Sequence, residues 1–525
     1  MPDTPAERGR TGRVSNIVRM TSMILPVVIL SKLLGMVRAM LLAGRLGAGR
    51  EMDAYTASYT LILTLMVLAG CFLTTAFLPI YSRTRARGGQ PAADRYASAT
   101  LTFFLLGSLA VGLLLYAFMP FIVSVYATGF DAEGRALAVR LSRIMLPMLV
   151  AQCASYLFGS VLNAHEDFAL PHLAATALSL TLIPTLLAAS SDDPVRLAVL
   201  VSAATTASAV LEALIQLPVA ARRVRFRPVL RPRDPLLGET LLVALPAVIA
   251  VAATELNQLL QNHLSSFLDA GANAVLSYGY NTYTIFIGVC VMPVTVILFS
   301  RLSAQAAAED RPLMLETLRR YLGTMLLVLL PLVAVSMLLS DDIIGLLYER
   351  GEFTGSDTAL TGAALMFFMP GLLGYAVKDV FSRFFFTLQD TRTPMMVGIA
   401  GLAVNVGLNY LLIGPMGVAG LALASSITLL LSGLALLLLL WRKTGSLELR
   451  RIAGETGRIL LCAVGAALLC AAAARLLAGR GVLVRLLLAG GIPLVAYVAG
   501  VLALRVPSAR LLADEILGML RRKRA

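Results

Sequence analysis

The chain has 525 residues, of which 58% are hydrophobic and only 14% are charged, and its mean hydropathy is +0.82. Soluble domains carry about 25% charged residues, so the composition excludes a soluble globular protein and predicts an all-α integral membrane protein. Apolar runs of about 20 residues recur from end to end, which excludes a porin-type barrel with its short alternating segments. The net charge of +14 does not indicate a nucleic-acid partner, because the basic residues lie mostly in short loops that set membrane topology.

The first apolar run, residues 20–46, carries cations where a bilayer disfavours them. Lys32 and Arg38 lie in its middle and Arg45 lies near its far end. A charged side chain at bilayer depth costs about 2.5–3.5 kcal/mol on insertion scales. Lys32 and Arg38 point about 120° apart around a helix, so both can border one wide cavity. We expect these two to line a water-filled cavity or to meet an anion, whereas Arg45 suits a membrane interface or a gate.

About 14 transmembrane helices are predicted in chain order. They cover residues 20–46, 54–81, 97–120, 141–164, 170–190, 195–220, 238–268, 274–300, 318–339, 359–386, 394–414, 416–441, 456–476 and 483–505. Basic segments precede the first span and follow the second, sixth, eighth and twelfth spans, whereas the loops at 191–193, 341–342 and 349–357 are neutral or acidic. This pattern predicts that both termini are cytoplasmic. One loop is an exception, because Arg475, Arg480 and Arg485 fall on the predicted outer side.

An internal repeat predicts the domain organisation. The pattern D-x-x-x-P occurs at 167–171 and again at 390–394, 223 residues apart and at the same place in the topology. Six spans separate the copies, so both have the same orientation, as in two six-helix lobes related by a pseudo-two-fold axis along the membrane normal. The expected parts are a cytoplasmic tail (1–19), an N-lobe (20–221), a basic cytoplasmic linker (222–237), a C-lobe (238–441), two C-terminal spans (442–506) and a basic amphipathic tail (507–525) suited to anionic lipid.

The seventh span, the repeat partner of the first, is the most polar one. It carries Glu255, Gln258, Gln261, Asn262 and His263. At the repeat offset Lys32 corresponds to Glu255, so we hypothesise a pair between them across the lobe interface that stabilises one gate state. The alternative is a structural polar cluster.

Further polar residues lie in other spans. Tyr278 and Asn281 belong to an aromatic, polar stretch expected at the cavity or the lobe seam, and Asp53 is a candidate gate partner or helix N-terminal charge. Asn405 and Asn409 share a helix face; with Ser425 they could hold a cation, or they could hydrogen-bond between helices. Glu212 and the neighbouring pair Lys378 and Asp379 are additional buried-charge candidates.

The sequence carries no pattern typical of an enzyme. It contains no nucleotide-binding glycine loop, no Ser/His/Asp or metal-hydrolase spacing and no Cys/His cluster, and the loops are too short for a catalytic domain. We therefore expect a transporter without metal or cofactor.

Five stretches resemble a known family: SKLLGMVRAMLLAGRLGAGREMDAY (31–55), GCFLTTAFLPIYSR (70–83), RGEFTGSDT (350–358), FFFTLQDTRTP (384–394) and NYLLIGPMGVAGLALASSI (409–427). In them the chain is similar to the MurJ (MviN) lipid II flippases of the multidrug/oligosaccharidyl-lipid/polysaccharide exporter superfamily. The resemblance implies a V-shaped two-lobe fold with a central cationic cavity, in which the last two spans form a groove for a polyprenyl tail. It also implies a monomer in the bacterial cytoplasmic membrane, with anionic lipid and cell-wall synthesis and division proteins as partners.

The substrate implied by the resemblance is lipid II, undecaprenyl-pyrophosphate carrying the peptidoglycan disaccharide-pentapeptide. The family's two cavity arginines of span one fall on Lys32 and Arg38, and the acidic residue after the second falls on Ala39. Its arginines in spans two and eight fall near Thr64 and on Asn281.

The sequence leaves two possible energy sources for transport, the membrane potential and a coupling ion. The resemblance implies that some members are coupled to sodium through carboxylate-containing sites in spans seven, eleven and twelve. The matching positions here carry no carboxylate; they are Gln261, Asn405, Asn409 and Ser425. Three alternatives to lipid II transport remain: a flippase for another polyprenyl-linked glycan, a cation-coupled drug exporter, and a non-transporting scaffold that recruits cell-wall enzymes.

Overall fold

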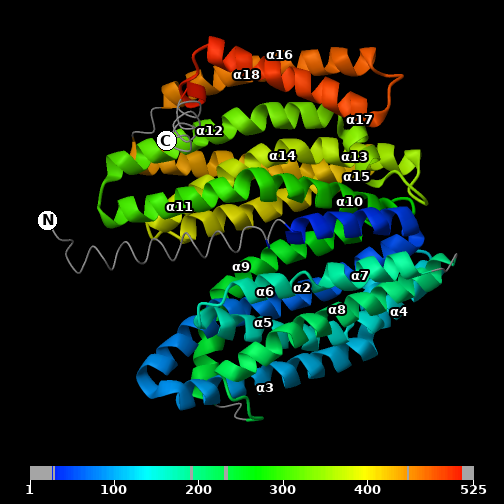
Figure 1. Ribbon diagram of the computed structural model, residues 1–525, viewed down its shortest axis with the longest axis vertical. Helices are drawn as coiled ribbons and strands as arrows, with labels where there is room; N and C mark the ends of the chain where they lie inside the picture. The colour runs from blue at the N-terminus through cyan, green and yellow to red at the C-terminus, as the bar shows by residue number, and fades with distance from the viewer. Residues whose placement is uncertain (1–26, 28–29, 190–192, 230–233, 446–448, 511–525) are drawn as a thin grey trace, which may run out of the picture. The chain divides into compact units, whose positions relative to one another are not determined.

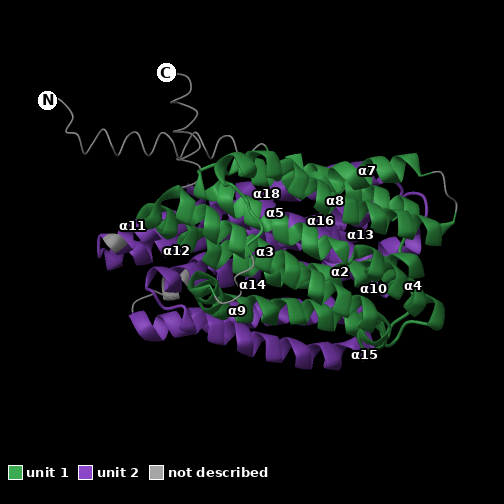
Figure 2. Ribbon diagram, turned by 90° about the horizontal axis from the view of Figure 1, so that it is seen from below, with its two compact units in different colours: residues 1–271 green, residues 272–525 purple. Residues whose placement is uncertain are grey.

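The computed structural model describes residues 27, 30–189, 193–229, 234–445 and 449–510 (Figure 1). The predicted cytoplasmic tail at 1–19, part of the basic linker and the amphipathic tail beyond residue 510 lie outside these residues. All regular structure in the described ranges is helical, which confirms the all-α prediction. The chain forms two compact units, residues 1–271 and 272–525 (Figure 2).

Unit 1 begins with a helix over residues 30–46. Its further elements are α2 (Arg50–Phe72), the π-helical turn η1 (Leu73–Phe77), α3 (Leu78–Tyr126), α4 (Ala132–Met145), α5 (Pro147–Ala164), α6 (Ala169–Ala174), α7 (Ala177–Ala188), α8 (Pro194–Arg223) and α9 (Pro235–Ser265). The two halves of α9, Pro235–Ile249 and Val251–Ser265, meet at a bend of 46°. Pro246 lies just before the bend, where it removes a backbone donor and crowds the preceding turn.

Unit 2 contains the remaining elements. These are α10 (Ala272–Phe286), the π-helical turn η2 (Ile287–Val291), α11 (Met292–Ala307), α12 (Arg311–Leu338), α13 (Ser340–Tyr348), α14 (Gly355–Thr387), α15 (Arg392–Thr444), α16 (Leu449–Leu476), α17 (Val482–Arg485), the π-helical turn η3 (Leu486–Gly490) and α18 (Gly491–Ala503).

Ten continuous helices in the described ranges are long and apolar enough to cross a membrane, or eleven if the bent α9 is one span. Two of the ten cover two predicted spans each, because the helical run from α2 to α3 turns at Gly89 and α15 turns at Gly417. The two glycines have φ values of +70° and +55°, which residues with a Cβ adopt rarely. The membrane-spanning, helical character is confirmed, and the number of 14 spans stays a prediction.

The outer faces of these helices suit a lipid environment. Large apolar side chains are exposed along them, as with Phe121 at 67%, Leu461 at 65% and Val495 at 72%. Such faces are unfavourable in water but match the hydrocarbon core of a bilayer.

Helix α9 packs within unit 1, although its residues were assigned to the C-lobe. The hydroxyls of Tyr96 on α3 and Thr240 on α9 form a buried hydrogen bond of 2.6 Å. Arg83 and Glu239 form an ion pair of 2.5 Å between the same helices. The boundary between the compact units lies at 271/272. The division into an N-lobe and a C-lobe with a linker at 222–237 stays a prediction.

The core of unit 1 is partly aromatic. Phe77 stacks on Tyr81 and on Tyr96, with ring centroids 5.4 Å and 5.2 Å apart. Leu157 and Val161 of α5 belong to the same buried cluster. Because Tyr96 also bonds to α9, the same cluster positions α9 against α3.

The last two spans pack on α12 inside unit 2. The Tyr497 hydroxyl of α18 donates to the Leu327 carbonyl of α12 at 2.7 Å. Ile459, Ala463 and Val501 pack against Leu327 in the same buried cluster. The small residues of α16 allow this close helix contact.

Two ion pairs of unit 2 differ in burial. Arg485 pairs with Asp342 of α13, which is only 5% exposed. Lys443 pairs with Asp390 at 2.7 Å, and the Lys443 side chain is 45% exposed. The hydrogen bond from Lys443, with that from the Thr393 backbone, lowers the pKa of Asp390 to about 2. Arg485, one of the three cations that contradicted the charge pattern, thus has a buried anionic partner.

Candidate substrate-binding site

Arg38 is directed into unit 1. Its Nη1 donates to Ser179 Oγ of α7 at 3.2 Å, and Ser179 is buried. Tyr55 and Tyr59 of α2 lie within electrostatic reach of the guanidinium. A guanidinium has five N–H donors, and this is its one hydrogen bond to the described residues, so donors remain for an anionic ligand. Ser179 was missed by the sequence analysis.

Lys32 lies on the same helix as Arg38, and its side chain is exposed. It forms no ion pair within the described ranges. Its ammonium is therefore available to an anion as a compact point charge, whereas Arg38 presents a planar fork of donors.

Glu255 does not pair with Lys32 in this structure. Its Oε2 accepts a hydrogen bond from Thr64 Oγ1 of α2 at 3.3 Å, so the carboxyl joins α9 to α2. Both Lys32 and Glu255 belong to unit 1, whereas the hypothesis placed them on opposite lobes. Equivalent positions in a repeat need not be neighbours, which is why the pair is not formed here.

Polar residues at the end of α9 hold it against α3. Asn262 Nδ2 donates to the Tyr126 hydroxyl at 3.0 Å, and His263 Nδ1 lies 2.9 Å from the Tyr126 carbonyl oxygen. These contacts favour the structural alternative for Asn262 over a substrate-binding role. Gln261 is buried and Gln258 is partly buried, and their predicted roles stay predictions.

Asp53 and Arg45, predicted as gate residues, make contacts within unit 1. Asp53 is 5% exposed, and its Oδ2 accepts from the Gly271 backbone N–H at 2.6 Å. Gly271 has a φ of +94°, and a Cβ there would lie 1.9 Å from the Ala48 carbonyl oxygen. Arg45 donates to the Ala189 carbonyl oxygen. Asp53 therefore ties the last residue of the loop that follows α9 to the start of α2.

The α10 candidates differ from each other in burial. Tyr278 is 1% exposed and packs against Tyr348 and Phe353, with centroid distances of 5.0 Å and 5.5 Å. It therefore belongs to the aromatic core of unit 2, which supports a packing role. Asn281 is exposed, and its carbonyl accepts from Thr284.

The predicted cation site in α15 contains a hydrogen-bonded amide pair. Asn409 Nδ2 donates to Asn405 Oδ1 at 2.8 Å, and Asn405 Nδ2 donates to Thr428 Oγ1 at 3.1 Å. Ser425 Oγ donates to the Leu421 carbonyl oxygen. Thr428 was not among the sequence candidates. This geometry supports the alternative of hydrogen bonds between helices, and the described part of the chain holds no cluster of three or more His, Cys, Asp or Glu residues suited to a metal.

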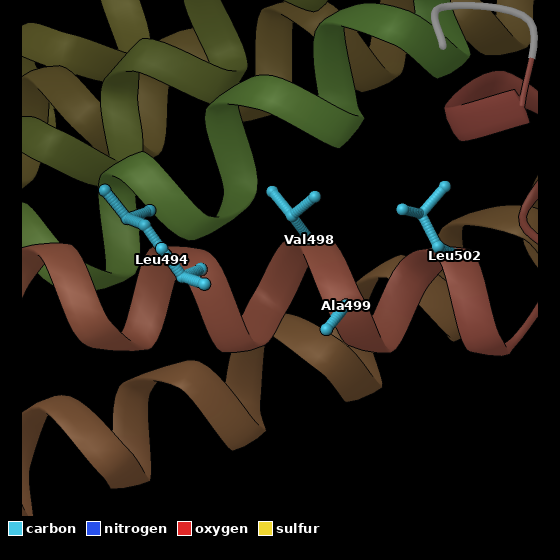
Figure 3. Close-up of a pocket in the computed structure, with 5 residues that line it drawn as sticks. Leu494, Val498, Ala499 and Leu502 are labelled. Atoms are coloured by element: carbon cyan, nitrogen blue, oxygen red, sulfur yellow. The ribbon is translucent and has the colours of Figure 1, made fainter.

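An open apolar groove of about 450 Å³ lies along α18 (Figure 3). Its lining side chains are Leu494, Val495, Val498, Ala499 and Leu502. None of them carries a polar group, so the groove suits a hydrocarbon chain.

Comparison with protein families gives a match over most of the chain. The family model described as "Lipid II flippase MurJ" matches residues 42–489. A "Probable lipid II flippase MurJ" of Rhizobium tropici is 29% identical over 422 residues, which cover 79% of each chain. A protein of the same description from Synechocystis sp. is 27% identical over 515 residues, 93% of this chain and 95% of the relative.

Solved structures share the fold. One titled "Lipid II flippase MurJ, inward closed conformation" has a TM-score of 0.79 at 21% identity, covering 94% of this chain and 99% of that one. An inward-facing MATE family transporter of the MOP superfamily has a TM-score of 0.67 at 16% identity, covering 81% of this chain and 98% of that one. At these identities the likeness concerns the fold alone.

Proposed function

The chain belongs to the lipid II flippase MurJ family, and from this we propose that it moves lipid II from the cytoplasmic to the outer leaflet for cell-wall synthesis. It is a transporter of alternating-access type and not an enzyme. The observation that supports this most directly is Arg38, a cation in a membrane span whose side chain is directed into unit 1.

The pyrophosphate of the substrate supplies the anion that these cations need. Arg38 offers a planar fork that can bind phosphate oxygens in pairs, and Lys32 adds a point charge six residues earlier on the same helix. An inside-negative potential favours outward movement of a doubly charged headgroup by about 4–5 kcal/mol per 100 mV. The membrane potential is therefore our proposed energy source.

The polyprenyl tail stays in lipid while the headgroup crosses. The apolar groove on α18 supports this division, because its lining residues offer no group that a sugar or phosphate could bind (Figure 3). We place the protein in the bacterial cytoplasmic membrane as a monomer, with both termini in the cytoplasm, where anionic lipid and cell-wall synthesis and division proteins are accessible.

A second candidate substrate is another polyprenyl-linked glycan. The family resemblance predicts arginines near Thr64 and at Asn281, and the Thr64 hydroxyl here donates to the carboxyl group of Glu255. A substrate with fewer charges would need fewer cations. Competition between lipid II and other polyprenyl-pyrophosphate glycans in proteoliposomes separates the two candidates.

The test is rescue of cells depleted of their own lipid II flippase. We expect the wild-type chain and Arg87→Ala, which removes an exposed arginine, to restore growth and lipid II export. Arg38→Ala should accumulate in the membrane to the same level and restore neither. Rescue by Arg38→Ala would refute the cavity role and favour a non-transporting scaffold, and failure of the wild-type chain with lipid II would refute the proposed substrate.

A further inference from the structure

Unit 1 contains a carboxyl group at membrane depth that the proposed transport mechanism does not use. Glu212 lies in α8, 18 residues after Pro194 and 11 residues before Arg223. At about 1.5 Å per residue it is about 27 Å and about 16 Å from the two helix ends. Because the hydrocarbon core is about 30 Å thick, Glu212 lies inside the bilayer and not at its surface.

Two neutral donors of α5 hold this carboxyl group, and both reach the same oxygen. Ser155 Oγ donates to Glu212 Oε1 at 2.9 Å, and Gln152 Nε2 donates to it at 3.2 Å. Gln216, 2% exposed, donates to Ser155 Oγ at 2.7 Å and to the Glu212 carbonyl oxygen at 3.3 Å. The bond from Gln216 orients the Ser155 hydroxyl, so its proton points at Glu212.

No cation pairs with Glu212 within the residues the structure describes. The titratable groups that face it are Tyr59 of α2 and Tyr156 of α5, both within electrostatic reach. Helix α7 carries no ionisable side chain. The helices packed on α8 carry basic groups that form neither a hydrogen bond nor an ion pair with Glu212. These are Arg50 on α2, Arg135, Arg140 and Arg143 on α4, and His172 on α6.

This arrangement fits a protonated carboxyl group. An ionised carboxylate inside a membrane needs a cation or many donors, whereas Glu212 has two neutral donors. In the neutral form Oε1 is the carbonyl oxygen that accepts both bonds, and Oε2 carries the proton. All observed bonds go to Oε1, as this form requires.

We propose that Glu212 is a membrane-embedded proton-binding site, which holds a proton on Oε2 in this structure and releases it to water during the transport cycle. The release step rests on the proposed function, whereas the binding of the proton does not. Tyr59 lies within electrostatic reach of both Glu212 and Arg38. A negative charge on Glu212 therefore acts electrostatically on the proposed anion site near Arg38. Ionisation of Glu212 weakens the binding of an anion there.

Infrared difference spectroscopy tests proton binding without any transport. The full-length protein in nanodiscs of neutral lipid is titrated with pH, and the carbonyl stretch of protonated carboxyl groups is followed. We expect a band that disappears at high pH in the wild type, is missing from Glu212→Gln, and persists in Glu316→Gln, which changes an exposed glutamate of α12. A band of full size in Glu212→Gln, or loss of the band on adding sodium at constant pH, would overturn the proposal.

A second variant keeps the test decisive if Glu212→Gln does not fold. Ser155→Ala removes one donor to the carboxylate, so the band should persist to higher pH; an unchanged titration would count against the site.

The release step is tested by lipid II transport in proteoliposomes at several pH values. We expect a pH-dependent rate in the wild type and a pH-independent rate in Glu212→Gln; identical pH profiles would overturn coupling. Absence of transport in the wild type would contradict the proposed function and leave the infrared result to decide proton binding.

Discussion

The buried ion pair between Arg485 and Asp342 gives a sharp prediction about stability. Replacing Arg485 by Met keeps most of the side-chain volume but leaves the carboxylate of Asp342, 5% exposed, without its cation. Asp341 is the next residue, and its burial together with the charge of Asp342 raises the pKa of Asp341. The variant therefore leaves two adjacent acidic groups in a confined position.

The expected magnitude follows from burial. Removing one partner of a buried pair costs about 3–5 kcal/mol, because the other charge stays buried and uncompensated. An exposed pair contributes only about 0–1 kcal/mol, which is the value expected for Lys443→Met, since the Lys443 side chain is 45% exposed. At roughly 2–4 °C per kcal/mol, Arg485→Met lowers the melting temperature by about 6–20 °C and Lys443→Met by about 0–4 °C.

The five cysteines supply the assay, because all are free thiols and none is exposed. A thiol-reactive fluorophore added to the purified protein during heating reports when the helices separate. The double variant Arg485→Met with Asp342→Asn should recover most of the lost melting temperature, because the buried charge is then removed. Equal losses in Arg485→Met and Lys443→Met, or no recovery in the double variant, would refute the reasoning.

Three other predictions concern the cation Lys32, the positive-φ residue Gly271 and the carboxylate of Asp390. Lys32→Arg should raise the transport rate in proteoliposomes, because a guanidinium binds pyrophosphate through paired donors; a lower rate would contradict the binding role. Gly271→Ala should lose about 1–3 kcal/mol from backbone strain alone, with more from the clash, whereas Gly398→Ala, whose Cβ meets no atom within 4 Å, should melt no lower than wild type. Because the Lys443 bond lowers the pKa of Asp390 to about 2, below its unfolded value of about 3.9, the carboxylate stabilises the fold above about pH 4. This contribution is lost as the pH falls toward about 2, and Asp390→Asn should remove the loss from melting curves recorded against pH.

Features that depend on spacing within one segment could be predicted from the sequence. Hydropathy locates the membrane helices, since each long apolar run must satisfy its own backbone hydrogen bonds in lipid. The four-residue spacing of Asn405 and Asn409 indicated a shared face, and the two amides are bonded to each other. Arg38 was identified because a cation inside an apolar run is conspicuous.

Features that depend on contacts between distant segments could not be predicted. Ser179 is 141 residues from Arg38, and a single hydroxyl in an apolar run carries no signal of its partner. Tyr278 was assigned to a seam because its hydroxyl is polar, yet its ring fills an aromatic core. The repeat offset related Lys32 to Glu255 by position in the fold, but it contains no information on distance.

The packing of α9 in unit 1 has a consequence for how the protein is synthesised. The ribosome completes α8 at Arg223 and must add 42 further residues before α9 ends at Ser265. At about 5–20 residues per second this takes about 2–8 s. During that interval the Tyr96 hydroxyl and the Tyr126 carbonyl lack the partners that α9 provides. The first half of the nascent chain is therefore an incomplete bundle until α9 has been synthesised.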